Sequence, residues 1–466
     1  MTQQAFLSAE GHQKTREEKK VLAGTLVGTT IEWYDFFIYA QAAGFVLAVL
    51  YFEPLGEENQ TLAQLVAWAS IGISFLFRPL GAILAGWLGD RYGRKLVLVL
   101  TLLGMGGATV LIGLLPTYAA WGIAAPILLV VLRILQGLSA GGEWGGAALL
   151  AVEHAPRHKR GLFGMYPQIG VPIGMFMAAT SMFGLRAALT EEQFLEWGWR
   201  VPFLFSFVLI IIAYLIRRRV EESPVFEEMK QRKKESSAPL KELLTTHKKN
   251  VFLTALIFSA NNAAGYMIIV FFASYASNAV GFSSTETLIA SLVGAVGWFI
   301  FTYFGGWISD RIGRVLTYQI GFGILILWCI PMWFLIDTGS LLLFAVAVFV
   351  LTMGLGPSYG PQSALYAEMF PADVRFSGVS IGYAFGSIMG GAFAATIAQA
   401  IYDATGQGWM IGLYLSGLSL ISLIAVSLVP TSLQGIDLEA GGDSAAEDPE
   451  ISDSGTRSSG EYVPVK

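Results

Sequence analysis

The sequence predicts an all-α membrane protein with twelve transmembrane helices in two pseudo-symmetric bundles of six. Three observations lead to this prediction. The 466-residue chain is 54% hydrophobic and only 14% charged, against roughly 45–50% and about 25% in soluble proteins, so much of its surface must face lipid. Twelve apolar runs of spanning length follow one another. A nonapeptide also recurs halfway along the chain, which indicates two related halves.

The apolar runs are rich in Leu, Ile, Phe, Ala and Gly and lack the strand-length alternation of a β-barrel, so helices are favoured. The runs are 21–50, 62–89, 96–115, 121–151, 162–187, 200–216, 251–279, 287–309, 315–336, 340–366, 377–402 and 409–429. The polar residues before the first run end in Arg16-Glu17-Glu18-Lys19-Lys20. They do not show the pattern of a cleavable signal peptide.

Basic residues gather on one side of the predicted membrane. Four of the 29 Lys and Arg precede the first run, ten lie from Arg217 to Lys249, and most others fall in loops on the same side. The positive-inside rule therefore predicts a plasma-membrane protein with both termini cytoplasmic. The predicted regions are a cytoplasmic segment (1–20), an N-terminal bundle (21–216), a cytoplasmic central loop with short interfacial helices (217–250), a C-terminal bundle (251–430) and a disordered acidic tail (431–466).

Two motifs recur in the two halves. Residues 86–94 (GWLGDRYGR) and 306–314 (GWISDRIGR) are identical at six of nine positions, at an offset of 220. Each copy joins the second and third runs of its half. Glu, Pro and Arg at positions 153, 156 and 160 recur at 368, 371 and 375, at an offset of 215. Because the two offsets nearly match, we expect the halves to be related along their whole length.

The nonapeptide predicts a tight turn between antiparallel helices. Its glycines permit the turn, and its Asp can complement the dipole of the next helix or pair with arginines across the gap. We expect this cluster to hold the bundles together in one state and release them in another, although a static turn with orienting charges is the alternative. The predicted gating residues are Gly86, Asp90, Arg91, Gly93, Arg94, Asp310, Arg311, Gly313 and Arg314.

The paired Gly-Xaa-Xaa-Xaa-Asp-Arg-Xaa-Gly-Arg motif with six-plus-six runs resembles the major facilitator superfamily. Further segments resemble its metabolite:proton symporters, which include carriers of shikimate, α-ketoglutarate, citrate and proline/betaine. These segments are 32–36 (EWYDF), 77–81 (FRPLG), 133–146 (RILQGLSAGGEWGG) and 196–203 (EWGWRVPF). The resemblance covers about residues 20–430 and is closest to the shikimate-type branch. It implies the major facilitator fold, alternating access and proton-driven uptake.

Acidic residues inside the predicted helices are candidates for proton coupling, because a charge at mid-bilayer costs at least ~2.5–3.5 kcal/mol. Glu32 and Asp35 are one helical turn apart and share a face. Two acids so close cannot both ionise easily in a poor dielectric, which suits a proton site, and Asp35 is slightly favoured. Glu143, among glycines of the fourth run, is the third candidate. Salt bridges to a neighbouring helix are the alternative for the Glu32 and Asp35 pair.

Two arginines are candidates for binding a substrate carboxylate. Arg78 precedes Asp90 by twelve residues, about 18 Å along a helix, and Arg133 lies deeper still. Their planar guanidinium groups suit a carboxylate, but either could instead balance Glu32 or Asp35. The neutral candidates, each of which could also be a packing contact between helices, are Gln136, Trp144, Gln168, Asn261, Asn262, Tyr359, Gln362 and Tyr383.

Other function classes lack support in the sequence. We find no phosphate loop and no nucleophile elbow, the four histidines lie outside the runs, and the lone Cys329 allows no intrachain disulfide. We therefore expect no enzyme activity, cofactor, metal or nucleic-acid partner. The expected function is a monomeric secondary transporter that imports a small carboxylate, such as shikimate or a dicarboxylate, with protons. A proline/betaine-type osmolyte symporter and a proton-antiport exporter are the alternatives.

Overall fold

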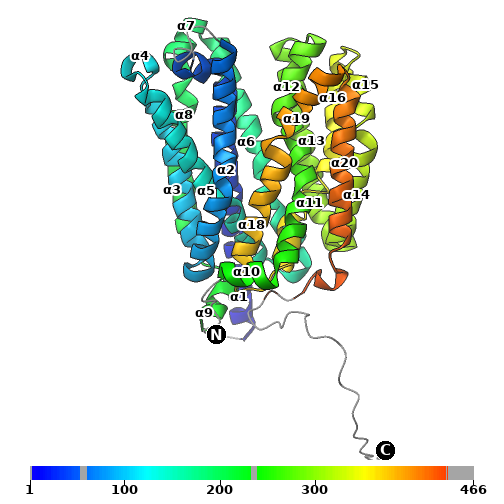
Figure 1. Ribbon diagram of the computed structural model, residues 1–466. Helices are drawn as coiled ribbons and strands as arrows, with labels where there is room; N and C mark the ends of the chain where they lie inside the picture. The colour runs from blue at the N-terminus through cyan, green and yellow to red at the C-terminus, as the bar shows by residue number, and fades with distance from the viewer. Residues whose placement is uncertain (1–2, 53–59, 232–238, 437, 439–466) are drawn as a thin grey trace, which may run out of the picture.

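The computed structural model describes residues 3–52, 60–231, 239–436 and 438, and the regular elements of this part of the chain are helices. Two bundles of long helices stand side by side (Figure 1). The chain enters the first bundle and leaves the last helix at the same end, which we call the terminal end. The opposite end is the far end. The bundles lie closer together at the terminal end than at the far end (Figure 1).

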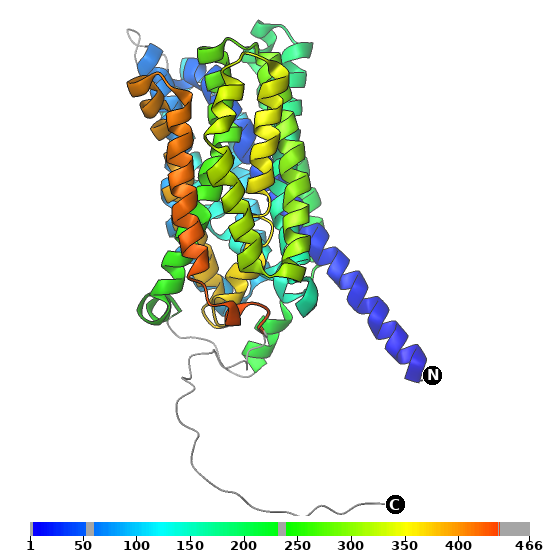
Figure 2. The same cartoon turned by 90° about the vertical axis from the view of Figure 1, so that its right-hand side faces the viewer.

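The first bundle contains six long helices. They are α1 (Gln3–Ala42) with its continuation η1 (Ala43–Phe52), α2 (Gln60–Tyr92), α3 (Arg94–Leu114), α5 (Ala124–Glu153), α6 (Arg160–Ala188) and α8 (Arg200–Arg218). Short elements join them: α4 (Tyr118–Trp121), η3 (Arg157–Lys159), α7 (Glu191–Gln193) and η4 (Phe194–Gly198). Figure 2 shows the N-terminal part of α1 projecting from the terminal end, so this helix begins well before the predicted run at 21.

The second bundle repeats this arrangement with more interrupted helices. Its spans are α11 (Lys248–Tyr266) with η5 (Met267–Phe271), α12 (Phe272–Tyr275) and η6 (Ala276–Val280); α13 (Ser284–Ile312); α14 (Arg314–Trp328) with α15 (Pro331–Ile336); α16 (Leu341–Leu355) with α17 (Gln362–Glu368); α18 (Arg375–Ser387) with η7 (Ile388–Ala392) and α19 (Ala394–Thr405); and α20 (Gly408–Ser427). The short helices α9 (Pro224–Gln231) and α10 (Pro239–Thr246) lie between the bundles in sequence, and η8 (Thr431–Leu433) follows the last span.

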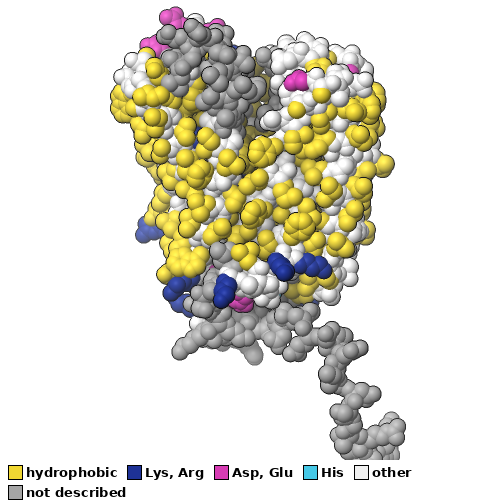
Figure 3. All heavy atoms as spheres, in the orientation of Figure 1, with side chains coloured by type: hydrophobic (Ala, Val, Ile, Leu, Met, Phe, Trp, Pro, Cys, Tyr) yellow, Lys and Arg dark blue, Asp and Glu magenta, His cyan; other side chains and the backbone are white. Residues whose placement is uncertain are grey.

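The helices have the length and composition of membrane spans. In the described chain nine helices are long and apolar enough to cross a membrane, and the bent pair 17–42 with 46–52 makes a tenth. The shorter apolar helices α14 and α16 continue into α15 and α17, which completes the twelve predicted spans. Figure 3 shows hydrophobic side chains over the sides of the molecule and Lys and Arg side chains near the terminal end.

The most extensive contacts between the bundles run along two helix pairs, α2 with α18 and α6 with α13. Glycines of the repeated nonapeptide permit both close approaches. A Cβ atom on Gly86 would lie 2.8 Å from the Cα atom of Ser377, and one on Gly306 would lie 2.6 Å from the Cβ atom of Met165. The related position of the two glycines gives the contact between the bundles an approximate twofold character.

The structure moves two predicted boundaries. Arg217, assigned to the central loop, lies inside α8 and is buried. The predicted disordered tail begins too early, because residues 431–436 fold back against the bundles: Gln434 Oε1 accepts a hydrogen bond from Val315 N (3.1 Å), and the Arg160 guanidinium donates to Ile436 O. Backbone contacts outweigh the polar composition here. Residues 439–466 lie outside the described chain.

Candidate functional site

Asp35 lies in the middle of α1 and is fully buried inside the first bundle. Its carboxylate accepts hydrogen bonds from Thr109 Oγ1 of α3 (2.9 Å) and from Ser206 Oγ of α8 (2.5 Å). Within the described chain, these two hydroxyl groups are the hydrogen-bond partners of the carboxylate. The alternative that an arginine pairs directly with Asp35 is therefore not what the structure shows.

Arg133 of α5 is connected to Asp35 by a chain of hydrogen bonds. Arg133 Nη1 donates to Gln136 Oε1 (2.7 Å), and Gln136 Nε2 donates to Thr109 Oγ1 (2.8 Å). The Arg133 guanidinium also lies 3.7 Å from the centre of the Tyr39 ring. Arg133 and Asp35 are thus opposite charges joined through two neutral side chains within the first bundle.

Glu143 forms a buried ion pair with Arg217 of α8. Thr101 Oγ1 donates a further hydrogen bond to Glu143 (2.5 Å), and Arg217 also donates to the carbonyl of Leu98. The glycines around Glu143 allow the neighbouring helices to approach α5 closely. The Glu143 carboxylate therefore finds its partners inside the first bundle. Proton coupling by Glu143 would require this ion pair to open.

Glu32 and Arg78 lie closer to the second bundle. The Arg78 guanidinium of α2 lies 4.4 Å from the centre of the Phe75 ring and 5.6 Å from that of Phe36. Its Nε atom and Glu32 Oε2 are buried and have no hydrogen-bond partner among the described residues. The Arg78 guanidinium also lies 5.8 Å from the centre of the ring of Trp33, the residue that follows Glu32. This unfilled bonding capacity is what a ligand-binding site requires.

The second bundle presents further unfilled polar atoms from α11. Asn262 Oδ1 and Tyr266 Oη are buried without a partner in the described chain. The Tyr266 ring packs edge-on against Phe75 (5.4 Å between ring centres) and Phe36 (6.1 Å), the same rings over which Arg78 lies. Groups from both bundles therefore surround one place between α1, α2 and α11.

Aromatic stacking continues across the bundle interface on the terminal side. Trp144 of α5 stacks on Tyr383 of α18 with ring centres 4.0 Å apart, and Tyr383 stacks on Phe258 at 4.4 Å. Trp144 Nε1 donates to Gln168 Oε1 (2.7 Å). Gln168 Nε2 in turn reaches the carbonyl of Tyr359 (3.2 Å) and Gln362 Oε1 (3.3 Å). These predicted residues form a layer that joins α5 and α6 to the second bundle.

Asn261, also a predicted site residue, makes its hydrogen bonds to another part of the second bundle. Its Nδ2 donates to the carbonyl of Leu355 (3.0 Å) and to Ser358 Oγ (2.9 Å). It therefore ties α11 to the break between α16 and α17, as a packing residue would. Adjacent residues on a helix point in directions about 100° apart, so Asn261 and its neighbour Asn262 serve different surfaces.

The repeated nonapeptides meet the opposite bundle at the terminal end. Asp90 accepts hydrogen bonds from Phe376 N and Ser377 N (both 3.0 Å) at the start of α18. Asp310 likewise accepts from Gly161 N and Leu162 N (both 2.8 Å) at the start of α6. As predicted, each Asp lies at the N-terminus of a helix and complements its dipole. The capped helix, however, belongs to the other bundle and is not the next helix in sequence.

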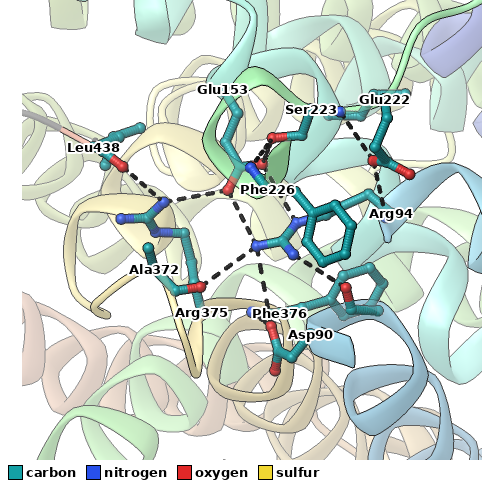
Figure 4. Close-up of polar contacts among 12 residues, drawn as sticks. Asp90, Arg94, Glu153, Glu222, Ser223, Phe226, Ala372, Arg375, Phe376 and Leu438 are labelled. Carbon is teal, nitrogen blue, oxygen red and sulfur yellow. Dashed lines mark hydrogen bonds and ion pairs between the residues drawn. The ribbon is translucent and has the colours of Figure 1, made fainter. Parts of the chain in front are cut away.

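The Glu and Arg residues of the second repeat pair crosswise beside these caps. Figure 4 shows Arg94 and Arg375 pointing toward Glu153 from opposite bundles, with distances of 3.4 Å and 3.2 Å. In the other copy Arg314 lies 3.5 Å from Glu368, and Arg160 acts on Glu368 electrostatically. Arg91 and Arg311 take no part and lie over Trp87 and Trp307 at the surface.

Gly93 and Gly313 allow the turn within each repeat, with φ angles of 108° and 93°. Each is followed by a helix whose first N–H groups are capped from a distant segment. Glu222 accepts from Arg94 N (3.0 Å) and Lys95 N (3.1 Å), and Gln434 accepts from Val315 N. The segment after α8 in the first half and the segment after α20 in the second half thus each cap the helix that follows the turn glycine.

Sequence reasoning missed several residues of these sites. Tyr266 is one helical turn after Asn262, a spacing that could have drawn attention to it. Arg217 is the first of three consecutive arginines at a predicted membrane boundary, and nothing in that run distinguishes it. Glu222 and Gln434 had no signal, because the helices they cap lie more than a hundred residues away.

Comparison with known proteins identifies the family. The Major Facilitator Superfamily model matches residues 34–395. The Escherichia coli (strain K12) inner membrane metabolite transport protein YhjE is 41% identical over 86% of this chain and 91% of its own length. The shikimate transporter of the same strain is 34% identical, with 87% and 93% covered. A putative proline/betaine transporter of Staphylococcus aureus (strain COL) is 30% identical, with 87% and 86% covered.

Solved structures confirm the predicted fold. The proton:xylose symporter XylE bound to 6-bromo-6-deoxy-D-glucose superimposes with a TM-score of 0.76 over 92% of this chain and 98% of that one, at 16% identity. A partially occluded inward-open form of XylE gives a TM-score of 0.68. Identity this low supports the fold alone, whereas the family match and the relatives support transport. The chain therefore belongs to the metabolite transporters of the major facilitator superfamily and is a multi-pass membrane transporter rather than an enzyme.

Proposed function

We propose that this transporter, acting as a monomer, takes up a small organic carboxylate together with protons. The observation that carries the proposal is the buried group of ionisable side chains in α1, α2 and α5, of which Glu32 and Arg78 have atoms without partners in the described chain beside the second bundle. A guanidinium suits a carboxylate, and an acid suits a proton. The names of the relatives, a metabolite transport protein and a shikimate transporter, agree with this chemistry.

We assign the terminal end to the cytoplasm on the positive-inside rule. The caps from Asp90 and Asp310 join the bundles at this end, and the bundles are farther apart at the far end (Figure 1). Release of the two caps would allow the cytoplasmic side to open, which is the alternating-access cycle.

The test is uptake into proteoliposomes with an imposed pH gradient. The panel contains labelled shikimate, α-ketoglutarate and glycine betaine. We expect an acidic exterior to drive accumulation of a carboxylate above equilibrium. Accumulation that is indifferent to the gradient for every panel member would refute proton coupling, and expulsion driven by the gradient would indicate an exporter.

The osmolyte alternative rests on one of the relatives, a putative proline/betaine transporter of Staphylococcus aureus (strain COL). Under this alternative glycine betaine would be taken up, and its uptake would be stimulated by raised external osmolarity. The buried Arg78 favours the carboxylate, because its charge would oppose an ammonium group at the same place.

A further inference from the structure

The charged side chains buried inside the first bundle are balanced in number. Apart from the charged residues at the terminal end (Asp90, Arg94, Glu153 and Arg160), the first bundle buries three acids and three arginines. They are Glu32, Asp35, Glu143, Arg78, Arg133 and Arg217. In the sequence, the charged residues between Asn250 and Pro430 are Glu286, Asp310, Arg311, Arg314, Asp337, Glu368, Asp373, Arg375 and Asp403. These all lie at or near helix ends or in loops. The net charge of these six buried groups is zero when all of them are ionised.

Two of the three opposite-charge sets are closed inside the first bundle. Glu143 and Arg217 are in direct contact. Asp35 and Arg133 are joined through Thr109 and Gln136. A ligand that took either charge would have to break these contacts, and leaving a buried charge without its partner is strongly unfavourable.

Glu32 and Arg78 are different. The Arg78 guanidinium lies 5.8 Å from the centre of the Trp33 ring and 5.6 Å from that of Phe36, both on the helix of Glu32. Glu32 Oε2 and Arg78 Nε nevertheless have no hydrogen-bond partner among the described residues. The other groups that act on Glu32 are Asp35 on its own helix, Glu143 of α5 and Arg217 of α8. From the second bundle, Glu32 acts on Tyr266, Tyr359 and Tyr383. Of the three opposite-charge sets, the Glu32 and Arg78 pair is the one that lies beside the second bundle with polar atoms that lack hydrogen-bond partners among the described residues.

We propose that Glu32 carries the transported proton and Arg78 binds the substrate carboxylate, in a ratio of one proton to one monocarboxylate. This deepens the proposed function and rests on it. In the empty carrier the Glu32 carboxylate offsets the Arg78 guanidinium. The substrate adds one negative charge and the proton on Glu32 removes one, so the loaded carrier is again neutral. Both forms then avoid the cost of an unbalanced charge in a low dielectric.

A neighbouring polar atom narrows the substrate further. Tyr266, whose ring packs against Phe75 as Arg78 does, has a hydroxyl group that can donate or accept a hydrogen bond and lacks a partner in the described chain. A monocarboxylate that also carries a hydroxyl group would satisfy it. A second carboxylate would leave one negative charge without a counter-charge, so a dianion such as α-ketoglutarate is expected to be excluded.

The electrical test uses the carboxylate of the panel that the wild-type protein accumulates. Potassium and valinomycin set the membrane potential independently of the pH gradient. We expect the initial rate to rise with the pH gradient and to be unchanged by the potential. A rate that follows the potential at constant pH gradient would overturn the one-to-one ratio, even though proton-driven uptake itself would stand.

The assignment of the proton to Glu32 is tested with a matched pair of variants. We expect Glu32→Gln to lose all stimulation by the pH gradient while it retains exchange of internal for external substrate. Asp403→Asn, which removes an exposed acid outside the site, is the control and should retain the stimulation. A Glu32→Gln protein that remains coupled, with Asp35→Asn uncoupled, would overturn the assignment without affecting the proposed function.

An infrared measurement decides the assignment without any substrate. The protonated carboxyl band of the purified protein is followed against pH. We expect Glu32→Gln to remove a pH-dependent band, Arg78→Gln to move its midpoint, and Arg133→Gln to leave the midpoint unchanged. A spectrum that Glu32→Gln does not alter would overturn the proposal whatever the transport assays show.

Discussion

At the scale of single residues, the sequence predicts which ionisable side chains are buried, but it does not predict which residues they contact. One criterion, an acid inside a predicted span, selects Glu32, Asp35 and Glu143. The structure gives them three different surroundings: unfilled bonding capacity within the described chain, two hydroxyl groups, and an arginine. Glu143 and Arg217 are 74 positions apart in sequence, and only the packing of α5 against its neighbours brings them together.

The Glu143–Arg217 pair predicts a strong non-additive effect on stability. Loss of one partner leaves a buried charge unpaired, which costs about 3–5 kcal/mol, whereas loss of both can be nearly neutral. We expect Glu143→Leu and Arg217→Met each to lower the free energy of unfolding in detergent, and the double variant to recover most of it. The exposed neighbour Arg218 supplies the control, Arg218→Met. A double variant as unstable as the sum of the singles would contradict this account.

At the scale of elements, the repeat determines how two helices end and two others begin. Gly93 and Gly313 have positive φ angles at the same place in the two copies. A Cβ atom on Gly93 would also clash with the Glu222 carboxylate that caps α3. The sequence predicts the turn, but it cannot predict the cap, because that acceptor comes from beyond α8.

The turn glycine can be tested against a glycine inside α3, the helix that follows it. A non-glycine residue in this backbone region costs about 1–3 kcal/mol, so Gly93→Ala is expected to lower the free energy of unfolding by at least that amount. A Cβ atom added at Gly107 would meet nothing within 4 Å among the described residues, and Gly107→Ala should be neutral or stabilising. Chemical denaturation followed by tryptophan fluorescence compares the two. Equal effects would show that the turn imposes no special conformation.

The cross-bundle caps predict a measurable opening of the terminal end. Losing one charged cap costs about 1–2 kcal/mol, roughly a 5- to 30-fold change in an equilibrium. We expect Asp90→Ala to speed maleimide labelling of the thiol introduced by Ser380→Cys, which lies buried at the bundle interface. Asp403→Ala, which removes an exposed acid at the other end of the molecule, is the control. An unchanged labelling rate would leave the cap as a static helix end.

At the scale of the whole molecule, the C-terminal segment connects the two bundles. The carbonyl of Gly435 accepts from Arg157 and that of Ile436 from Arg160, both in the first half. Gln434 caps α14, and the carbonyl of Leu438 accepts from Arg375 (3.3 Å), both in the second half. These contacts lie at the terminal end, beside the Glu153 network (Figure 4).

Truncation tests this connection. We expect a chain that ends at Pro430 to label faster at the Ser380→Cys thiol than the full chain, because the backbone acceptors of Arg157, Arg160 and Arg375 are lost. A chain that ends at residue 440 retains these acceptors and should label at the rate of the full chain. If both truncations behave like the full chain, the segment does not contribute to closure of this end.

The sequence by itself determined the number of spans, the division into halves and the short list of ionisable groups. The length, charge and repetition of the apolar runs are local properties of the sequence. In lipid, a helix is the favoured structure because it satisfies the hydrogen bonds of its own backbone. The tertiary structure alone decided which charges meet. Asp90 caps α18 and Asp310 caps α6, each across the two bundles, and Tyr266 of the second bundle packs against the Phe75 ring over which Arg78 lies. Such pairings depend on how twelve helices pack, and residues more than a hundred positions apart leave no mark on one another's local sequence.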